Sequence, residues 1–319
     1  MCALYGWLSY KNIVPYKVLK KLTQALANAA EERGTDAAGI SYVKDGKVTI
    51  YKRPKPAHRV HFNIPENTVA VMGHTRMATQ GDKKHNYNNH PFAGHADKDF
   101  AFAHNGVLYN DTSLRRDKHL PDTHIETDSY IAVQLIEQQK KLDSDTLANM
   151  AETVQGNFTF TLLDEYNSLY IVKGSNPMFL IHFEALGLYV YASTESIMMN
   201  ALRKIGLHKF PYTKVETTEG DILRIDKNGT VTRSEFKPAP RCTRFMSWYD
   251  EPYYSMHEEL LLAYCGCYGV DSADVEMLLE YGYTCDEIED MLADHELLRE
   301  TICAVKGEEE YSDYLLEAF

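Results

Sequence analysis

The second residue of the chain, Cys2, carries a side chain suited to nucleophilic chemistry. If Met1 is removed, as a small second residue permits, the Cys2 thiol lies beside its own α-amino group. An α-amine has an ordinary pKa of about 7.7–8.0 and a thiol one of about 8.5, so the amine can accept the proton that the thiol releases at neutral pH. One residue then supplies both the nucleophile and the base. The alternative is that Cys2 is an apolar residue that opens a strand.

Cys2 also begins an ordered series of short motifs. They are Cys2–Gly6, Arg33–Gly39, Gly73–Thr79, Asn89–Phe92, His104–Gly106 and Glu126–Ser129. Two weaker motifs follow later in the chain, at Ala192–Glu195 and Glu219–Leu223. The series resembles the glutaminase domain of the class II glutamine amidotransferases, a family of N-terminal-nucleophile hydrolases. That family includes the glutaminase halves of glucosamine-6-phosphate synthase and glutamine phosphoribosylpyrophosphate amidotransferase. Each motif is weak evidence alone, but the ordered set is specific. The resemblance covers residues 2–236 and implies a four-layer αββα sandwich.

The resemblance implies hydrolysis of the side-chain amide of glutamine. Cys2 would form a γ-glutamyl thioester, ammonia would leave, and water would release glutamate. The oxyanion donors would be the side chain of Asn105 and the backbone N–H of Gly106. Arg76 would bind the α-carboxylate of glutamine as a guanidinium fork, and Asp128, in the first turn of a helix, would bind the α-ammonium group.

Other motif residues have weaker assignments. Thr79 and His90 match positions that line the glutamine pocket in the family, while we expect Arg33 and Asp36 to tie the fold together near the nucleophile. The family often has Trp where Met77 stands; Met77 can form the same apolar wall but cannot donate an indole hydrogen bond.

Ordinary structural roles compete with these assignments. An isolated Arg or Asp is usually a solvated surface charge, and an Asn-Gly pair is usually a turn. A hairpin turn at Asn105–Gly106, directly after the strand-like residues 100–103, is therefore an alternative to an oxyanion hole.

The clustering of histidines suggests a metal site. Nine of the 13 histidines lie between His58 and His124. However, His85, His90 and His95 are spaced by five residues, unlike a helical zinc pair, and no acidic or Cys partner stands at ligand spacing. We therefore expect neither a metal nor a cofactor.

Apolar periodicity predicts many hairpins with helices between them. Strands are expected at 3–9, 38–43, 48–52, 68–72, 100–109, 157–163, 169–172, 179–183, 188–192, 221–225 and 231–236, and helices at 18–29, 129–140, 142–154 and from 195. Residues 79–98 are expected to be a polar loop. This order indicates an α+β fold with largely antiparallel sheets, rather than a doubly wound parallel sheet.

The charge distribution divides the chain. The net charge of −13 results from a −18 segment, 247–319, and a +5 remainder. This break predicts a glutaminase-like domain at 1–236, a linker at 237–246 and an acidic helical C-terminal region at 247–319. Helices are expected at 253–264, 272–281 and 285–293, the last two capped by Ser272 and Thr284. So acidic a region would repel nucleic acid.

The remaining composition indicates the class of protein. No apolar run approaches a membrane span, the N-terminus does not resemble a signal peptide, and six cysteines are too sparse for a disulfide scaffold. We therefore expect a cytoplasmic protein that binds neither membranes nor nucleic acid.

About 80 residues follow the glutaminase-like part, too few for a phosphoribosyltransferase or sugar isomerase domain. We expect a glutaminase that hands ammonia to a separate synthase, with the acidic region as a docking module. Alternatively, the protein hydrolyses another γ-glutamyl amide without ammonia transfer, or it is a catalytically silent binding protein. The apolar stripes of the acidic region would either pack on the basic body or form a small bundle that binds a partner.

Overall fold

The structure is a computed structural model that describes residues 2–238, 261–262, 264–265, 270–292 and 297–307. The chain divides into two compact units, Met1–Cys242 and Thr243–Phe319, and each is described by itself. Residues 239–246 lie outside the described residues, so the linker at 237–246 and the domain boundaries beside it stay predictions.

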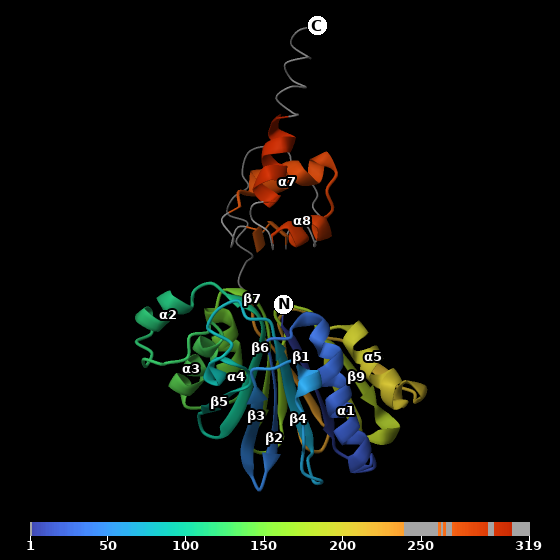
Figure 1. Cartoon of the computed structure of the whole chain (residues 1–319). Helices are drawn as coiled ribbons and strands as arrows, with labels where there is room; N and C mark the ends of the chain where they lie inside the picture. Colours follow the sequence, from blue (N-terminus) through green and yellow to red (C-terminus); the bar gives the residue numbers. More distant parts are fainter. Residues whose placement is uncertain (1, 239–260, 263, 266–269, 293–296, 308–319) are drawn as a thin grey trace. The chain divides into compact units, whose positions relative to one another are not determined.

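The first unit contains two sheets in which every strand pair is antiparallel (Figure 1). The first sheet has the order β11-β9-β10-β1-β4-β2-β3 and the second the order β13-β12-β8-β7-β6-β5. The first consists of β1 (Ala3–Ser9), β2 (Ala37–Lys44), β3 (Lys47–Arg53), β4 (Ala70–Arg76), β9 (Phe179–Phe183), β10 (Leu188–Ala192) and β11 (Thr213–Val215). The second consists of β5 (Phe92–His95), β6 (Asp99–Leu108), β7 (Gly156–Asp164), β8 (Leu169–Val172), β12 (Asp221–Ile225) and β13 (Val231–Glu235).

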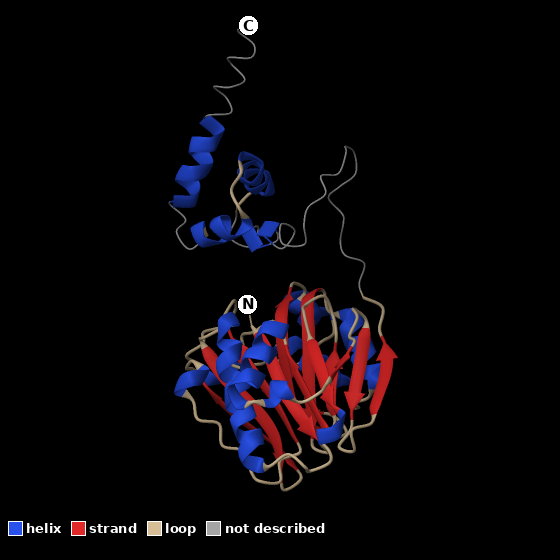
Figure 2. Cartoon of the chain, turned by 90° about the vertical axis from the view of Figure 1, so that its right-hand side faces the viewer, coloured by secondary structure: helices blue, strands red, loops and turns tan. Residues whose placement is uncertain are grey.

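Helices cover the outer face of each sheet (Figure 2). The helices on the first sheet are α1 (Tyr16–Ala29) and α5 (Glu195–Ile205), and those beside the second are α2 (Asp111–Asp117), α3 (Tyr130–Gln139) and α4 (Ser144–Thr153). A third apolar cluster fills the space between the sheets. The predicted α+β class and four-layer αββα sandwich are confirmed.

Strand β1 shows how the sequence produces these layers. Side chains alternate between the two faces of a strand. Tyr5 and Trp7 face α1, where the Trp7 indole N–H donates to Thr23 Oγ1 at 2.9 Å, whereas Leu4 and Leu8 face the second sheet. Because both faces of β1 are covered, the strand lacks charged residues and is buried along its whole length, including its last residue, Ser9.

Most predicted elements are present, but the polar stretch at 79–98 is not entirely a loop. It contains β5, which pairs with β6. Strand β4 begins at Ala70 and continues to Arg76, beyond the predicted end at Met72, and the sequence did not predict α2 or β11. In β4, pairing with β1 and β2, which are distant in the chain, supplies backbone hydrogen bonds that local composition did not indicate. Strand β5 forms a hairpin with the strand that follows it, β6.

The second unit is helical in its described parts. It contains α7 (Ser272–Tyr281), α8 (Cys285–Met291) and a helix over 297–307, and its buried apolar residues form one cluster. Asp271, not Ser272, caps α7, since its carboxylate accepts the N–H of Ala273 at 3.1 Å. Thr284 and Glu287 form the capping box at α8. Most of the predicted helix at 253–264 lies outside the described residues.

Candidate active site

Backbone contacts hold Cys2 at the head of β1, between β4 and β10. The backbone carbonyl of Cys2 accepts a hydrogen bond of 2.9 Å from Arg33 Nε. Two residues further on, Leu4 N donates to Ser193 Oγ at 2.8 Å, and Ser193 N donates back to the Leu4 carbonyl at 2.9 Å. The expectation that Arg33 ties the fold together beside Cys2 is confirmed. Ser193, which the sequence analysis did not assign, joins β10 to the start of β1.

The Cys2 thiol is partly buried, and its Sγ lies 3.5 Å from the backbone carbonyl of Met77. Burial raises the pKa of the Cys2 thiol. The positive charge of Arg76 lowers this pKa and the negative charge of Asp128 raises it, but burial outweighs them. The thiol is therefore mainly protonated at neutral pH, and it needs a proton acceptor before it can attack a carbonyl group.

Asn105 and Gly106 lie within β6, so the alternative of a hairpin turn is wrong. Asn105 is 1% exposed, and its side-chain amide lies 3.5 Å from Ser193 Oγ. Gly106 has a φ of +142°, and a Cβ there would lie 1.8 Å from the carbonyl oxygen of Asn157 on β7. Glycine is required at this position both for the backbone conformation and for the close approach of the two strands.

Arg76 is the last residue of β4 and is 3% exposed. Its Nη1 donates to Asn89 Oδ1 at 2.7 Å, and its Nη2 donates to the backbone carbonyls of Gln80 and Gly81 at 2.5 and 3.1 Å. Burial lowers the pKa of the guanidinium, although the nearby carboxylate of Asp128 is among the groups that oppose this shift. Arg76 thus holds the loop that follows β4, residues 77–83, through two of the loop's backbone carbonyls.

Asp36 holds the same loop through other atoms. Its carboxylate accepts the N–H of Ala78 at 2.9 Å and Lys83 Nζ at 2.5 Å. Although burial opposes the shift, these two donors hold the pKa of Asp36 below its usual range. The expected tying role of Asp36 is therefore confirmed. Thr79 is exposed within this loop.

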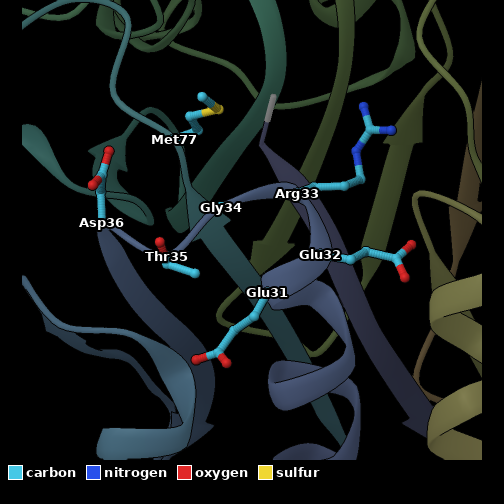
Figure 3. Close-up of a pocket in the computed structure, with 7 residues that line it drawn as sticks. All are labelled: Glu31, Glu32, Arg33, Gly34, Thr35, Asp36 and Met77. Carbon is cyan, nitrogen blue, oxygen red and sulfur yellow. The ribbon is translucent and has the colours of Figure 1, made fainter. Parts of the chain in front are cut away.

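A cavity of about 540 Å³ opens beside the nucleophile, lined by residues 31–36 and Met77. In Figure 3 the side chains of Arg33 and Asp36 lie on opposite sides of Gly34, and Met77 lies above Asp36. A Cβ on Gly34 would lie within 2.7 Å of the backbone of Arg76 and Met77. The turn at Gly34 therefore packs directly against the end of β4, which places the cavity next to the carbonyl that contacts the thiol.

Asp128 lies two residues before α3 rather than inside its first turn, and it is 4% exposed. One carboxylate oxygen accepts the N–H of Leu108 at 2.7 Å, and the other accepts the hydroxyl of Ser129 at 3.2 Å. Ser129 Oγ in turn lies 2.8 Å from Nδ1 of His104. These contacts fix a buried carboxylate whose charge acts on both Cys2 and Arg76.

Three buried histidines, His74, His90 and His104, support this site. His74 Nε2 donates to the backbone carbonyl of His104 at 2.9 Å, which joins β4 to β6 across the two sheets. The His90 ring stacks on His74 at 4.2 Å and contacts Phe92 at 4.4 Å, and both of its ring nitrogens lack a partner among the described residues. Burial lowers the pKa of all three, that of His74 to about 3. The motifs contained these residues, but their spacing could not indicate this stacking.

These histidines should make stability depend on pH. The unfolded chain protonates a histidine near pH 6.5, whereas His74 stays neutral in the folded protein down to about pH 3. The unfolded state therefore binds more protons between these values, and stability is lost as the pH falls below about 6.5. One such residue accounts for about 2 kcal/mol between pH 7 and pH 5. We expect the urea midpoint of the wild type to fall between pH 7 and pH 5, and that of His74→Gln to fall less steeply with pH. If the two midpoints fell equally steeply, His74 would not be a buried neutral histidine that lowers stability in acid.

Among the described residues, no group of three or more His, Cys, Asp or Glu side chains is arranged to hold a metal ion. Likewise, no helix in the described part of the chain is long and apolar enough to cross a membrane.

Residues 74–200 match the family model described as a glutamine amidotransferase domain. The chain is 29% identical over 232 residues to glutamine–fructose-6-phosphate aminotransferase (isomerizing) of Staphylococcus epidermidis, a match that covers 69% of this chain and 37% of that protein. The same enzyme of Staphylococcus aureus is 30% identical over 193 residues, covering 56% of this chain and 30% of that protein. The chain thus spans about a third of the length of these relatives.

Two solved structures have a fold similar to that of this chain. Glutamine phosphoribosylpyrophosphate amidotransferase from Bacillus subtilis superposes with a TM-score of 0.57 at 22% identity, covering 74% of this chain and 49% of that chain. A structure described as the allosteric regulatory enzyme of purine biosynthesis gives the same TM-score at 21% identity and the same coverage. The sequence matches and the fold likeness both lie within the two-sheet body that begins with Cys2, and together they support a class II glutamine amidotransferase domain in this part of the chain.

Proposed function

We propose that the protein hydrolyses the side-chain amide of glutamine to glutamate and ammonia through a thioester on Cys2. The observation that carries this proposal is the placement of Cys2 at the head of β1, where the charges of Arg76 and Asp128 both act on its thiol. The ends of an amino acid carry opposite charges, and these two side chains carry the charges that complement them.

The raised pKa of the Cys2 thiol supports the α-amine as the group that accepts its proton. Because the Cys2 thiol is mainly protonated, its own α-amine takes the proton as sulfur attacks the amide carbon. The carbon–sulfur bond forms and the carbonyl electrons move to oxygen, where the Asn105 amide and the Gly106 N–H stabilise the charge. The carbon–nitrogen bond then breaks, the α-ammonium returns the proton to the leaving group, and ammonia departs. Water attacks the thioester, releasing glutamate and the thiol.

Arg76 and Asp128 position the substrate in this proposal. Three N–H groups of the Arg76 guanidinium contact Asn89 and the 77–83 loop, and we assign the others to the α-carboxylate of glutamine. Asp128 binds the α-ammonium group. We keep Thr79 as a pocket-lining residue on the same loop, and we assign His90 to the pocket wall through its stacking on His74.

The fate of ammonia is a separate part of the proposal. The names of the relatives describe an aminotransferase and an amidotransferase, reactions that give the nitrogen of glutamine to an acceptor. We propose that a separate synthase accepts ammonia from this protein and that the acidic region 247–319 docks that synthase. We also propose a cytoplasmic location, supported by the four described cysteines being free thiols.

The test is the intact mass after incubation with a glutamine-mimicking electrophile, together with glutamate and ammonia assays on glutamine and on γ-glutamyl methylamide. We expect a protein without Met1, one adduct on Cys2, and equal amounts of glutamate and ammonia from glutamine. Faster release of methylamine would favour the hydrolase of another γ-glutamyl amide. A protein with neither adduct nor turnover would be the catalytically silent binding protein.

A further inference from the structure

The segment between β8 and β9 contains Asn176, which no motif of the sequence included. Its backbone N–H donates to the carbonyl of Phe158 at 3.2 Å, and its carbonyl accepts the hydroxyl of Thr159 at 2.7 Å. Both partners belong to β7, the strand that pairs with β6. Asn176 is therefore fixed from both sides against the sheet that carries Asn105.

The side chain of Asn176 reaches the backbone of that neighbouring strand. Its Nδ2 donates to the carbonyl oxygen of Asn105 at 2.8 Å. This carbonyl belongs to the same peptide unit as the N–H of Gly106. In a trans peptide the N–H points away from the C=O, so a hydrogen bond that fixes one also fixes the direction of the other. A donor on the carbonyl also polarises the peptide, which strengthens its N–H as a donor.

Gly106 provides the space for this contact. A Cβ on Gly106 would lie 2.7 Å from Asn176 Nδ2, in addition to its clash with Asn157. The other side of Asn105 is held by Ser193, whose hydroxyl lies 3.5 Å from the Asn105 side-chain amide. The side chain and the following peptide of Asn105 thus each have a dedicated partner.

We propose that Asn176 is a positioning residue for the oxyanion hole: its amide orients and polarises the Asn105–Gly106 peptide so that the Gly106 N–H meets the developing oxyanion. The inference rests on the proposed hydrolysis through Cys2. Asn176 itself does not touch the substrate. Because the oxyanion exists only in the transition state and intermediates, the loss of Asn176 lowers kcat and leaves KM for glutamine nearly unchanged.

The test compares Asn176→Asp and Asn176→Ala with the full-length wild-type protein and with Asn200→Asp, an exposed control on α5. Aspartate keeps the shape of asparagine but has no N–H to donate. We expect kcat to fall about 10- to 100-fold in both variants, since removing an oxyanion donor outright costs about 10²–10³. KM should change less than about twofold, and the control should match the wild type.

A second measurement separates this role from a structural one. Iodoacetamide alkylates a thiol by displacement at carbon, with no oxyanion, so the rate of Cys2 alkylation, followed by peptide mass, should equal that of the wild type in both Asn176 variants. Alkylation that slows in parallel with kcat overturns the proposal, because the nucleophile itself would then be disturbed. If the wild type is active and the kcat of Asn176→Asp lies within twofold of it, the positioning role of Asn176 is wrong, while the proposed hydrolysis stands. If the wild type itself releases no glutamate, the proposed hydrolysis is wrong, and the role of Asn176 that rests on it is wrong as well.

Discussion

Cys2→Ala is expected to release no measurable glutamate, a loss of at least about 10⁴-fold, while its thermal unfolding midpoint stays close to that of the wild type. The chemical reason is that in the proposed mechanism the thiol forms the thioester. The structural reason is that Arg33 holds Cys2 through its backbone carbonyl, whereas the Sγ atom makes a long contact, of 3.5 Å, with the Met77 carbonyl. Glutamate release and a thermal melt, measured on one preparation, check both halves of the prediction.

Cys303→Ala, which removes an exposed free thiol, is the matched control and should keep full activity. A chain with one additional, uncleaved residue before Cys2 should be as inactive as Cys2→Ala, because its α-amine can no longer accept the thiol proton. Turnover by Cys2→Ala would exclude the thioester mechanism, and turnover by the extended chain would exclude the amine as the base.

Arg76→Lys is expected to lower kcat/KM for glutamine by about 10²-fold or more, mainly by raising KM. An ammonium group is a single point of charge and cannot contact Asn89, the 77–83 loop and a carboxylate at once, as the planar guanidinium can. Because Arg76 is 3% exposed, water cannot replace the lost contacts. Steady-state kinetics on glutamine measure the change, with the exposed Arg116→Lys as the control.

Asp128→Asn tests the proposed contact with the α-ammonium group of glutamine, as Arg76→Lys tests the proposed contact with its α-carboxylate. An asparagine can still accept the N–H of Leu108, so the start of α3 should stay in place while the negative charge is lost. This variant should bind glutamine more weakly and discriminate less against analogues without an α-amine. If both Arg76→Lys and Asp128→Asn kept the KM of the wild type, the assignment of the glutamine pocket would be wrong.

The sequence by itself determined the secondary structure wherever the local pattern was strong. Strands β8, β9, β10 and β12 have the bounds that apolar composition predicted, and so does helix α7. In these segments burial of the apolar side chains and local backbone preference favour the same conformation. The sequence also indicated the glutamine amidotransferase resemblance, because an ordered set of short motifs preserves information that no single residue carries. The role of Cys2 as nucleophile stays a prediction.

Only the tertiary structure decided how the polar motifs are arranged. The sequence left Asn105–Gly106 open between the predicted strand at 100–109 and a hairpin turn. Strand β6 continues through these residues because β7, about 50 residues later in the chain, supplies the pairing partners. His74, stacked under His90, reaches the carbonyl of His104 only because the two sheets pack face to face. Asn176 reaches the peptide of Asn105 across 71 positions of sequence. Each contact joins residues that folding brings together from distant parts of the chain, so no local pattern could indicate it.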